Sequence, residues 1–182
     1  MSPLMTSIFT ARLVLLPLSC EMIEKRLAHE EFNLIADTPE GPLSVHFDSQ
    51  WAGGLRDLFP HLLEQMRRQG LAAQAGIFCV ALRETGQAVG DIGTKGQPSA
   101  AGEQEIGYGF NPAHWGQGYA TEAVSALVQQ LVAQPEIKVV TAQTAQSNRA
   151  SERVLEKLAF TRTGQSWDEE DGDLTVWSKS KH

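Results

Sequence analysis

The sequence has few cysteines and no cysteine pair at the spacing that zinc sites and redox motifs use. Cys20 and Cys79 are the only two cysteines among 182 residues, which excludes a disulfide framework and a C-x-x-C centre. The five histidines are scattered and form no H-E-x-x-H motif. We therefore expect a protein that works without a bound metal.

Long apolar stretches and an excess of positive charge are missing as well. The apolar run Leu13–Leu18 is interrupted by Pro17 and is far shorter than the roughly 18–20 residues of a membrane span. Lys and Arg number 15 against 22 Asp and Glu, a formal net charge of −7. Such a chain lacks the general positive field that neutralises nucleic-acid phosphates. These absences predict a cytoplasmic protein that binds neither membranes nor nucleic acid, with room for one anionic ligand at a locally favourable spot.

What is present is the composition of an ordinary globular protein. Hydrophobic residues make up 42% and charged residues 20% of the chain. A chain of this length can bury a sizeable core without disulfides, and it suits one domain over residues 1–182.

Apolar periodicity predicts a mixed α/β domain. Helical spacing is found at 20–34, 55–66, 118–133 and 151–158, and loops are expected at 37–51 and 96–102. Strands are expected at 12–18, 77–82, 88–92, 105–110, 138–144, 160–164 and 174–178. This order indicates a mostly antiparallel central sheet with flanking helices, in which strands 105–110 and 138–144 form a parallel pair.

The most informative stretch is Ile106–Leu127, where a strand leads through a glycine-containing turn into a helix. Gly116 and Gly118 let the backbone approach a ligand closely, and the free N–H groups of a helix that starts at about Gln117 attract phosphate. The stretch has neither the Lys of a P-loop nor the G-x-G-x-x-G pattern, so a nucleotide-binding α/β domain is disfavoured. A plain glycine turn before a helix is the alternative.

The strand before this turn has two different faces. One face carries apolar residues that are expected in the core, namely Ile106, Tyr108 and Phe110. The other face carries Glu105 and then only Gly107 and Gly109. A face with one carboxylate and almost no side chains suits a long, thin ligand that lies against the backbone. The alternative is that the glycines mark a bulge or a close strand crossing.

Two segments resemble motifs of the GNAT N-acetyltransferases. The run Trp115–Ala123, WGQGYATEA, resembles the family's acetyl-CoA-binding turn Gln/Arg-x-x-Gly-x-Gly/Ala, with Gly118 and Ala120 at its last two fixed positions. Trp115 replaces the Gln/Arg, a form seen in the branch that acetylates ribosomal-protein N-termini. The segment 148–160, NRASERVLEKLAF, resembles the block N-x-x-S-x-x-x-x-E-K-x-G-F, with Ala159 in place of Gly. The resemblance covers nearly the whole chain apart from 37–75.

The resemblance implies a GNAT-like fold whose parallel strand pair is splayed around a coenzyme groove. It implies transfer of acetyl from acetyl-CoA, with no metal, to a primary amine of a peptide N-terminus or a small molecule, by direct attack in a ternary complex. The residues implied in coenzyme binding are Tyr108, Phe110, Trp115, Gly116, Gln117, Gly118, Tyr119, Ala120, Thr121 and Asn148. The choice of acceptor is expected to lie in 37–75 and the C-terminal hairpin, and a homodimer is left open.

Two residues are expected to carry the chemistry. Glu105 is the candidate base for the attacking amine, directly or through water, and its alternative is a solvated strand residue. The resemblance places Ser151 near the sulfur, where it would hydrogen-bond the leaving thiolate; the alternative for Ser151 and Asn148 is helix capping. The family often uses a tyrosine as acid, and neither tyrosine of this chain stands at that position. The alternative function is therefore an acyl-CoA-binding module without turnover.

Overall fold

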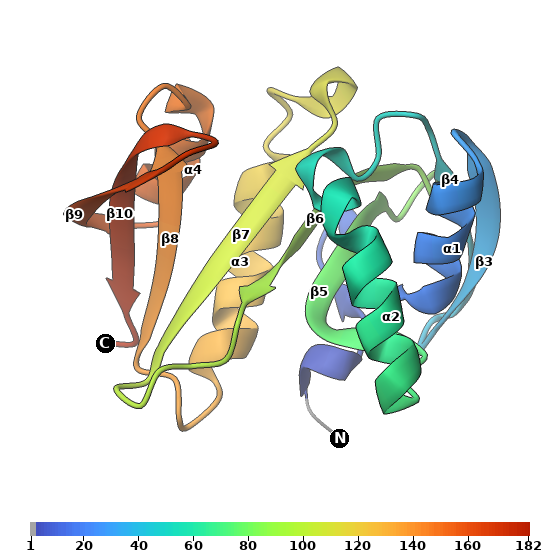
Figure 1. The fold of residues 1–182 in the computed structure, drawn as a ribbon, viewed down its shortest axis with the longest axis horizontal. Coiled ribbons are helices and arrows are strands. Elements are labelled where there is room, and N and C mark those ends of the chain that lie inside the picture. Colours follow the sequence, from blue (N-terminus) through green and yellow to red (C-terminus); the bar gives the residue numbers. More distant parts are fainter. Residues whose placement is uncertain (1–2) are drawn as a thin grey trace. The chain divides into compact units, whose positions relative to one another are not determined.

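The computed structural model describes residues 3–182 (Figure 1). They form two compact units. The first unit holds the chain up to Gly93 together with Tyr108–Ala123, and the second holds Thr94–Gly107 and Val124–His182. Strands β6 (Ala88–Lys95) and β7 (Glu103–Phe110) and helix α3 (Tyr119–Val132) each have residues in both units. The order of the main sheet is β1-β2-β5-β6-β7-β8-β10-β9.

The first unit is built on antiparallel strands. Strand β1 (Ile8–Phe9) pairs with β2 (Leu13–Ser19), β2 pairs with β5 (Ala73–Leu82), and β5 pairs with β6. Helices α1 (Cys20–Ala28) and α2 (Phe59–Gln69) pack against each other (Figure 1). Three short 3₁₀ helices complete the unit: η1 (Pro3–Met5), η2 (Gly53–Leu58) and η3 (Pro112–His114).

The core of the first unit contains a group of stacked aromatic rings. Phe32 and Phe47 stack with ring centroids 4.4 Å apart, and Trp51 meets Phe47 edge-on at 4.6 Å. The fully buried Arg26 lies over Phe32 and Trp51 and donates to the carbonyls of His29, Glu30 and Asp48. Desolvation lowers the pKa of Arg26. Phe47 and Trp51 are therefore core residues, as aromatic residues usually are.

The structure corrects the prediction for residues 20–51. Helix α1 begins after Ser19, whose hydroxyl accepts from the N–H of Met22, and it ends at Ala28 instead of 34. Residues 32–47 form a hairpin of β3 (Phe32–Thr38) and β4 (Gly41–Phe47). The predicted helix end and the predicted loop at 37–51 are wrong here because the period changes to that of a strand. In β3 Phe32 and Leu34 are buried and Ala36 and Thr38 are half-buried, whereas the residues between them are exposed.

The second unit contains the parallel strand pair. Residues Glu103–Ile106 of β7 pair in parallel with Val139–Ala142 of β8 (Val139–Ala145). Strand β10 (Gly172–Ser180) pairs antiparallel with β8 and with β9 (Thr161–Asp168), and α4 (Arg149–Lys157) lies between β8 and β9 in sequence. The predicted mixed α/β fold with a mostly antiparallel sheet and a parallel pair is confirmed.

Several predicted boundaries move by a few residues. Helix α3 starts at Tyr119 rather than at Gln117 or Gly118, because Gly118 has φ +82° and cannot belong to a right-handed helix. Strand β9 continues to Asp168 because it pairs along β10. Ile106 is buried as predicted, whereas Tyr108 and Phe110 are only partly buried, so the apolar face of β7 is not wholly in the core.

Candidate active site

The chain after β7 is anchored at Asn111 in the first unit. The backbone N–H of Asn111 donates to the carbonyl of Val89 at 2.8 Å. Its side chain is 3% exposed and donates to Asp48 Oδ1 and to the carbonyl of Ala88, both at 3.3 Å. The end of β7 is therefore fixed where the glycine-containing turn begins.

The turn itself presents unshielded backbone to solvent. Trp115, with 64% of its surface exposed, donates from Nε1 to the carbonyl of Phe110 at 2.7 Å. Gly116 has φ +74° and Gly118 has φ +82°, the left-handed region that only glycine enters easily. A Cβ built on Gly116 would meet nothing within 4 Å. The first turn of α3, including Tyr119, Ala120 and Thr121, follows directly, so its free N–H groups lie beside an open approach.

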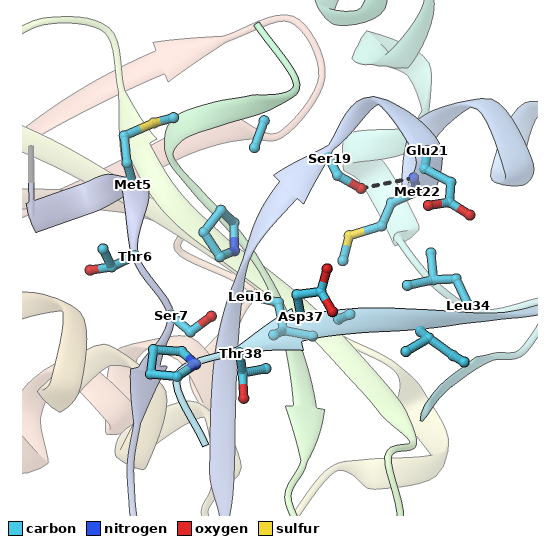
Figure 2. A pocket seen from close by; sticks show the side chains of 15 residues that line it. Met5, Thr6, Ser7, Leu16, Ser19, Glu21, Met22, Leu34, Asp37 and Thr38 are labelled. Carbon is cyan, nitrogen blue, oxygen red and sulfur yellow. Dashed lines mark hydrogen bonds between the residues drawn. The ribbon is translucent and has the colours of Figure 1, made fainter. Parts of the chain in front are cut away.

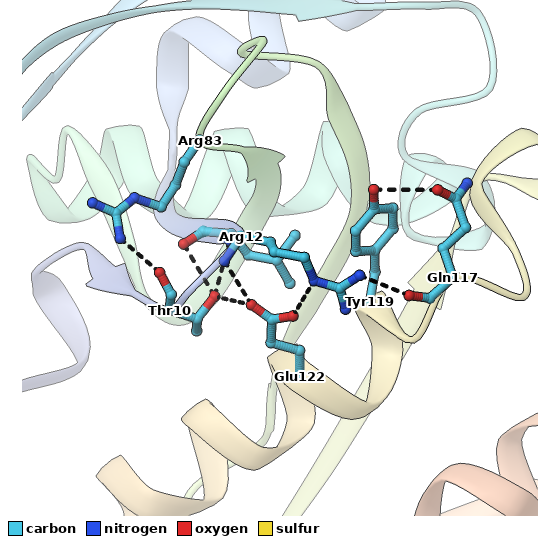
Figure 3. Close-up of polar contacts among 7 residues, drawn as sticks. Thr10, Arg12, Arg83, Gln117, Tyr119 and Glu122 are labelled. Atoms are coloured by element: carbon cyan, nitrogen blue, oxygen red, sulfur yellow. Dashed lines mark hydrogen bonds and ion pairs between the residues drawn. The ribbon is translucent and has the colours of Figure 1, made fainter.

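A polar cluster holds this turn from the N-terminal segment (Figure 3). The Arg12 cluster consists of Thr10, Arg12, Gln117, Tyr119 and Glu122. Arg12 Nε pairs with Glu122 Oε2 at 2.7 Å, its Nη1 donates to the carbonyl of Gln117 at 2.9 Å, and its guanidinium lies 4.7 Å from the ring centre of Tyr119. The backbone N–H of Arg12 and the hydroxyl of Thr10 both donate to Glu122 Oε1, at 2.8 and 2.6 Å.

Hydrogen bonding determines the charge state of Glu122. Partial burial alone would raise the pKa of this carboxyl. The hydroxyl of Thr10, the N–H and guanidinium of Arg12 and its positive charge outweigh burial and lower the pKa. Glu122 is thus ionised at neutral pH and compensates the charge of Arg12.

Glu105 lies in the second unit with two polar neighbours. Lys95 Nζ is 3.5 Å from Glu105 Oε1, and Gln143 Nε2 donates to the same oxygen at 3.4 Å. The Glu105 side chain is 29% exposed, so it is neither fully solvated nor buried. A Cβ on Gly107 would lie 2.7 Å from Lys95 Cε. The face that the sequence predicts to be bare is therefore partly covered by the flexible Lys95 side chain.

Asp91 is a second carboxylate near the glycine-containing strand, in the first unit. A Cβ on Gly109 would lie 3.9 Å from Asp91 Oδ2, and Asp91 stands opposite Cys79 in the β5–β6 register. Desolvation raises the pKa of Asp91 to about 7. Burial, with Asp91 as a lesser cause, raises the pKa of the Cys79 thiol, which is fully buried.

The first turn of α4 holds the other predicted residues in the second unit. Asn148 is the residue before the helix, and its Oδ1 accepts from the N–H of Ser151 at 3.1 Å. Asn148 therefore caps helix α4, and its predicted contact with the coenzyme stays a prediction. Arg149, the first residue of the helix, is ion-paired with the buried Glu152.

Of the twelve predicted site residues, nine lie in the first unit and three in the second. The structure brings together those of the turn and of the first turn of α3, and it joins Asn148 to Ser151. A separate cavity of about 520 Å³ lies in the first unit between β2, α1 and β3, with Ser19, Glu21 and Asp37 among its lining residues (Figure 2). All its lining residues fall between Met5 and Ala73, so it shares none with the predicted site.

Comparison with known proteins identifies the family. Residues 49–161 match the family model described as the acetyltransferase (GNAT) domain. The chain belongs to the GNAT family. It is 28% identical to the uncharacterized N-acetyltransferase p20 of Bacillus licheniformis over 103 residues, which cover 57% of this chain and 58% of p20. The chain spans about half the length of the curated relatives that it matches.

Solved GNAT structures share the fold. A GNAT-family acetyltransferase from Bacillus anthracis has a TM-score of 0.66 and 19% identity, covering 97% of this chain and 99% of that one. The RimL ribosomal L7/L12 alpha-N-protein acetyltransferase, in complex with coenzyme A, has a TM-score of 0.65 and 14% identity, covering 96% and 97%. At these identities the likeness concerns the fold alone.

The sequence motifs did not indicate two of the residues described above, Arg12 and Asp91. Arg12 stands in the sequence only as a charge beside an apolar strand, and no local pattern links it to Glu122, 110 positions later. Asp91 is a charged residue within a predicted strand that is otherwise apolar, and its desolvation depends on neighbours that are distant in sequence. Among residues 3–182, no helix has the length and apolarity to cross a membrane, and no three His, Cys, Asp or Glu side chains are grouped as metal ligands.

Proposed function

We propose that this protein is an N-acetyltransferase that transfers acetyl from acetyl-CoA to a primary amine. Membership of the GNAT family supports the reaction class. The observation that carries the proposal is the turn at Gly116 and Gly118: two left-handed glycines, an open approach and free N–H groups at the start of a 14-residue helix. The helix dipole adds positive potential at the same place, which favours a pyrophosphate.

The residues of the turn fit the coenzyme. The pyrophosphate is proposed to accept from the backbone N–H groups of 117–121, because a side chain at Gly116 would fill the space that the phosphates need. Trp115, Tyr108 and Phe110 flank this region as surfaces for the rest of the coenzyme. The backbone of Tyr108–Phe110 is proposed to polarise the thioester carbonyl; the N–H of Asn111 is excluded from this role, since it already donates to Val89.

The chemical roles are proposed residue by residue. Acetyl-CoA supplies an activated thioester carbonyl, and the acceptor amine attacks it directly in the ternary complex. Glu105 takes the proton of the amine, directly or through water, and its contacts with Lys95 and Gln143 support an oriented carboxylate. Ser151 donates a hydrogen bond to the thiolate as the C–S bond breaks, and Asn148 holds Ser151 at the helix start and contacts the pantetheine arm.

An amine panel tests the proposal. Purified protein is incubated with acetyl-CoA and with amines that include peptide N-termini, amino acids, polyamines and aminoglycosides, and both CoA thiol and acetylated product are measured. Amine-dependent thiol release with an equal amount of acetylated product is expected. A protein that binds acetyl-CoA in calorimetry, yet releases no thiol with any amine, would instead be the acyl-CoA-binding module that the sequence leaves as the alternative.

A further inference from the structure

We propose that Arg12 is a positioning residue that orients the phosphate-binding turn, an inference that rests on the proposed coenzyme site. Arg12 lies in the connection between β1 and β2, more than 100 positions before the turn, and all its partners are in the first unit. Its guanidinium contacts the turn at Gln117 and the helix at Glu122 (Figure 3). One side chain therefore joins the last carbonyl before Gly118 to the first turns of α3.

The peptide plane explains how this contact orients a phosphate donor. Arg12 Nη1 holds the carbonyl oxygen of Gln117 at 2.9 Å. In a planar trans peptide, the carbonyl of one residue and the N–H of the next point in opposite directions. The N–H of Gly118 is thereby turned away from Arg12, toward the side on which a ligand can approach. Without the hydrogen bond from Arg12 to the Gln117 carbonyl, the Gln117–Gly118 peptide could rotate, because glycine is conformationally permissive, and the Gly118 N–H would have no fixed direction.

The charges of the Arg12 cluster indicate orientation rather than attraction. Glu122 accepts three hydrogen bonds, two of them from Arg12, and its ion pair balances the guanidinium. The pair adds no net charge beside the helix start, so attraction of phosphate is left to the N–H groups and the helix dipole. Arg12 Nη2 also lies 3.4 Å from the position of a Cβ on Gly118. Arg12 thus packs against the residue whose N–H it directs.

The test compares two arginine variants with two ligands. Arg12→Gln removes the contacts with Gln117 and Glu122. Arg67→Gln is the matched control, because Arg67 also forms an ion pair with a glutamate of the first unit, Glu24, but contacts neither the Arg12 cluster nor the turn. The dissociation constants of CoA and of acetylpantetheine, which lacks the pyrophosphate, are measured by calorimetry at a temperature where circular dichroism shows each variant folded.

We expect Arg12→Gln to weaken CoA binding about 10- to 100-fold, the effect of losing a charge-assisted contact, and to change acetylpantetheine binding less than about twofold. Arg67→Gln should change neither dissociation constant. Arg12→Lys should give a CoA affinity between those of wild type and Arg12→Gln, since a single ammonium replaces the forked guanidinium donor. If Arg12→Gln does not fold, the CoA affinity of Arg12→Lys tests the positioning role instead. Wild-type affinity for CoA in the Arg12 variants, or equal losses for both ligands, would overturn the positioning role alone. Failure of the wild-type protein to bind CoA would overturn the proposed function and this inference with it.

Discussion

At the scale of single residues, two carboxylates have different environments. Glu105 has a lysine and an amide as neighbours, whereas the side-chain hydrogen bonds and ion pairs described for residues 3–182 include none to the carboxylate of Asp91. For Asp91 desolvation dominates and raises the pKa to about 7. These environments lead to one prediction on turnover and one on stability.

Glu105→Gln should lower turnover, because the amide cannot take the proton of the attacking amine. Loss of a general base costs about 10²- to 10⁴-fold in rate. The loss should shrink as the pH rises, since more of the acceptor amine is then already neutral. Glu103→Gln is the control, an exposed carboxylate two residues earlier on β7. A Glu105→Gln variant with the wild-type rate and pH profile would assign Glu105 to the solvated-residue alternative.

Asp91 should make stability depend on pH in an unusual direction. Its pKa is raised from 3.8 to about 7, so between about pH 4 and 7 the folded state retains a proton that the unfolded chain has released. The free energy of unfolding should therefore fall as the pH rises through this window and should be level above it. Asp91→Asn should remove the fall, and at pH 8 it should be more stable than wild type by a few kcal/mol at most.

Denaturant unfolding at pH 4.5, 6, 7 and 8 measures this linkage. The exposed Asp173 provides the control variant Asp173→Asn, which makes the same change in charge. If the free energy of unfolding depends on pH in the same way in wild type and in Asp91→Asn, then burial does not raise the pKa of Asp91 as described.

At the scale of elements, helix α4 combines a strong start with a strained end. Asn148 caps the first turn, and Ala159, just beyond the end, has φ +60°. The resembling family block has glycine at this position. A left-handed conformation costs a non-glycine residue about 1–2 kcal/mol, so the helix end is held by its surroundings at the expense of local strain.

Ala159→Gly should stabilise the protein by about 1 kcal/mol, because glycine adopts the same φ without the Cβ clash. The matched control is Ala150→Gly in the exposed first turn of α4, which should destabilise by up to about 1 kcal/mol because the residue is helical there. Melting temperature and denaturant midpoint measure both variants. If Ala159→Gly is less stable than wild type, the contacts of the Ala159 methyl group stabilise the protein by more than the backbone strain destabilises it.

Variants in the first turn of α4 should distinguish a capping role from a catalytic role. Asn148→Ala should lower stability by about 1 kcal/mol through loss of the cap on Ser151 and should raise the KM for acetyl-CoA. Ser151→Ala should lower kcat roughly 3- to 100-fold with little change in KM, since the hydrogen bond proposed for Ser151 matters only as charge develops on the sulfur. Ser19→Ala, which removes the cap of α1, is the control and should affect stability only. Wild-type kinetics in both α4 variants would remove this segment from the mechanism.

At the scale of the whole molecule, each unit has one buried and one exposed tryptophan. Trp51 and Trp177 are 0% and 1% exposed, and Trp115 and Trp167 are each 64% exposed. Trp51 donates to the carbonyl of Gly90, and Trp177 donates to the hydroxyl of Thr144. The buried pair can therefore report on the packing of each unit separately.

The two units should unfold together, because β6, β7 and α3 each contribute residues to both. In a background of Trp115→Phe and Trp167→Phe, adding Trp177→Phe leaves Trp51 as the probe, and adding Trp51→Phe leaves Trp177. In each variant the unfolding transition measured by tryptophan fluorescence should coincide with the transition measured by far-ultraviolet circular dichroism. If the unfolding midpoint from tryptophan fluorescence differs from the midpoint from circular dichroism in either variant, the two units unfold independently.

Local pattern was sufficient for most elements and for the glycine-containing turn. The alternation in β7, the helical spacing of α3 and the punctuation by Pro112, Gly116 and Gly118 are short-range properties, and the structure agrees with them to within a few residues. The hairpin of β3 and β4 was not predicted, because two buried residues at 32 and 34 are too few to distinguish a strand from the end of a helix.

Only the tertiary structure decided which side chains lie around the candidate site residues. Arg12 and Glu122, Lys95 and Glu105, and Asp91 and Gly109 come together through strand pairing and packing, which no spacing in the sequence records. The pKa of a carboxyl depends on the water, charges and donors around it, and these are set by residues that are distant along the chain. The sequence by itself determined the elements, the family motifs and the conformational freedom of the turn. The fold decided how the turn is held and which carboxylate is desolvated.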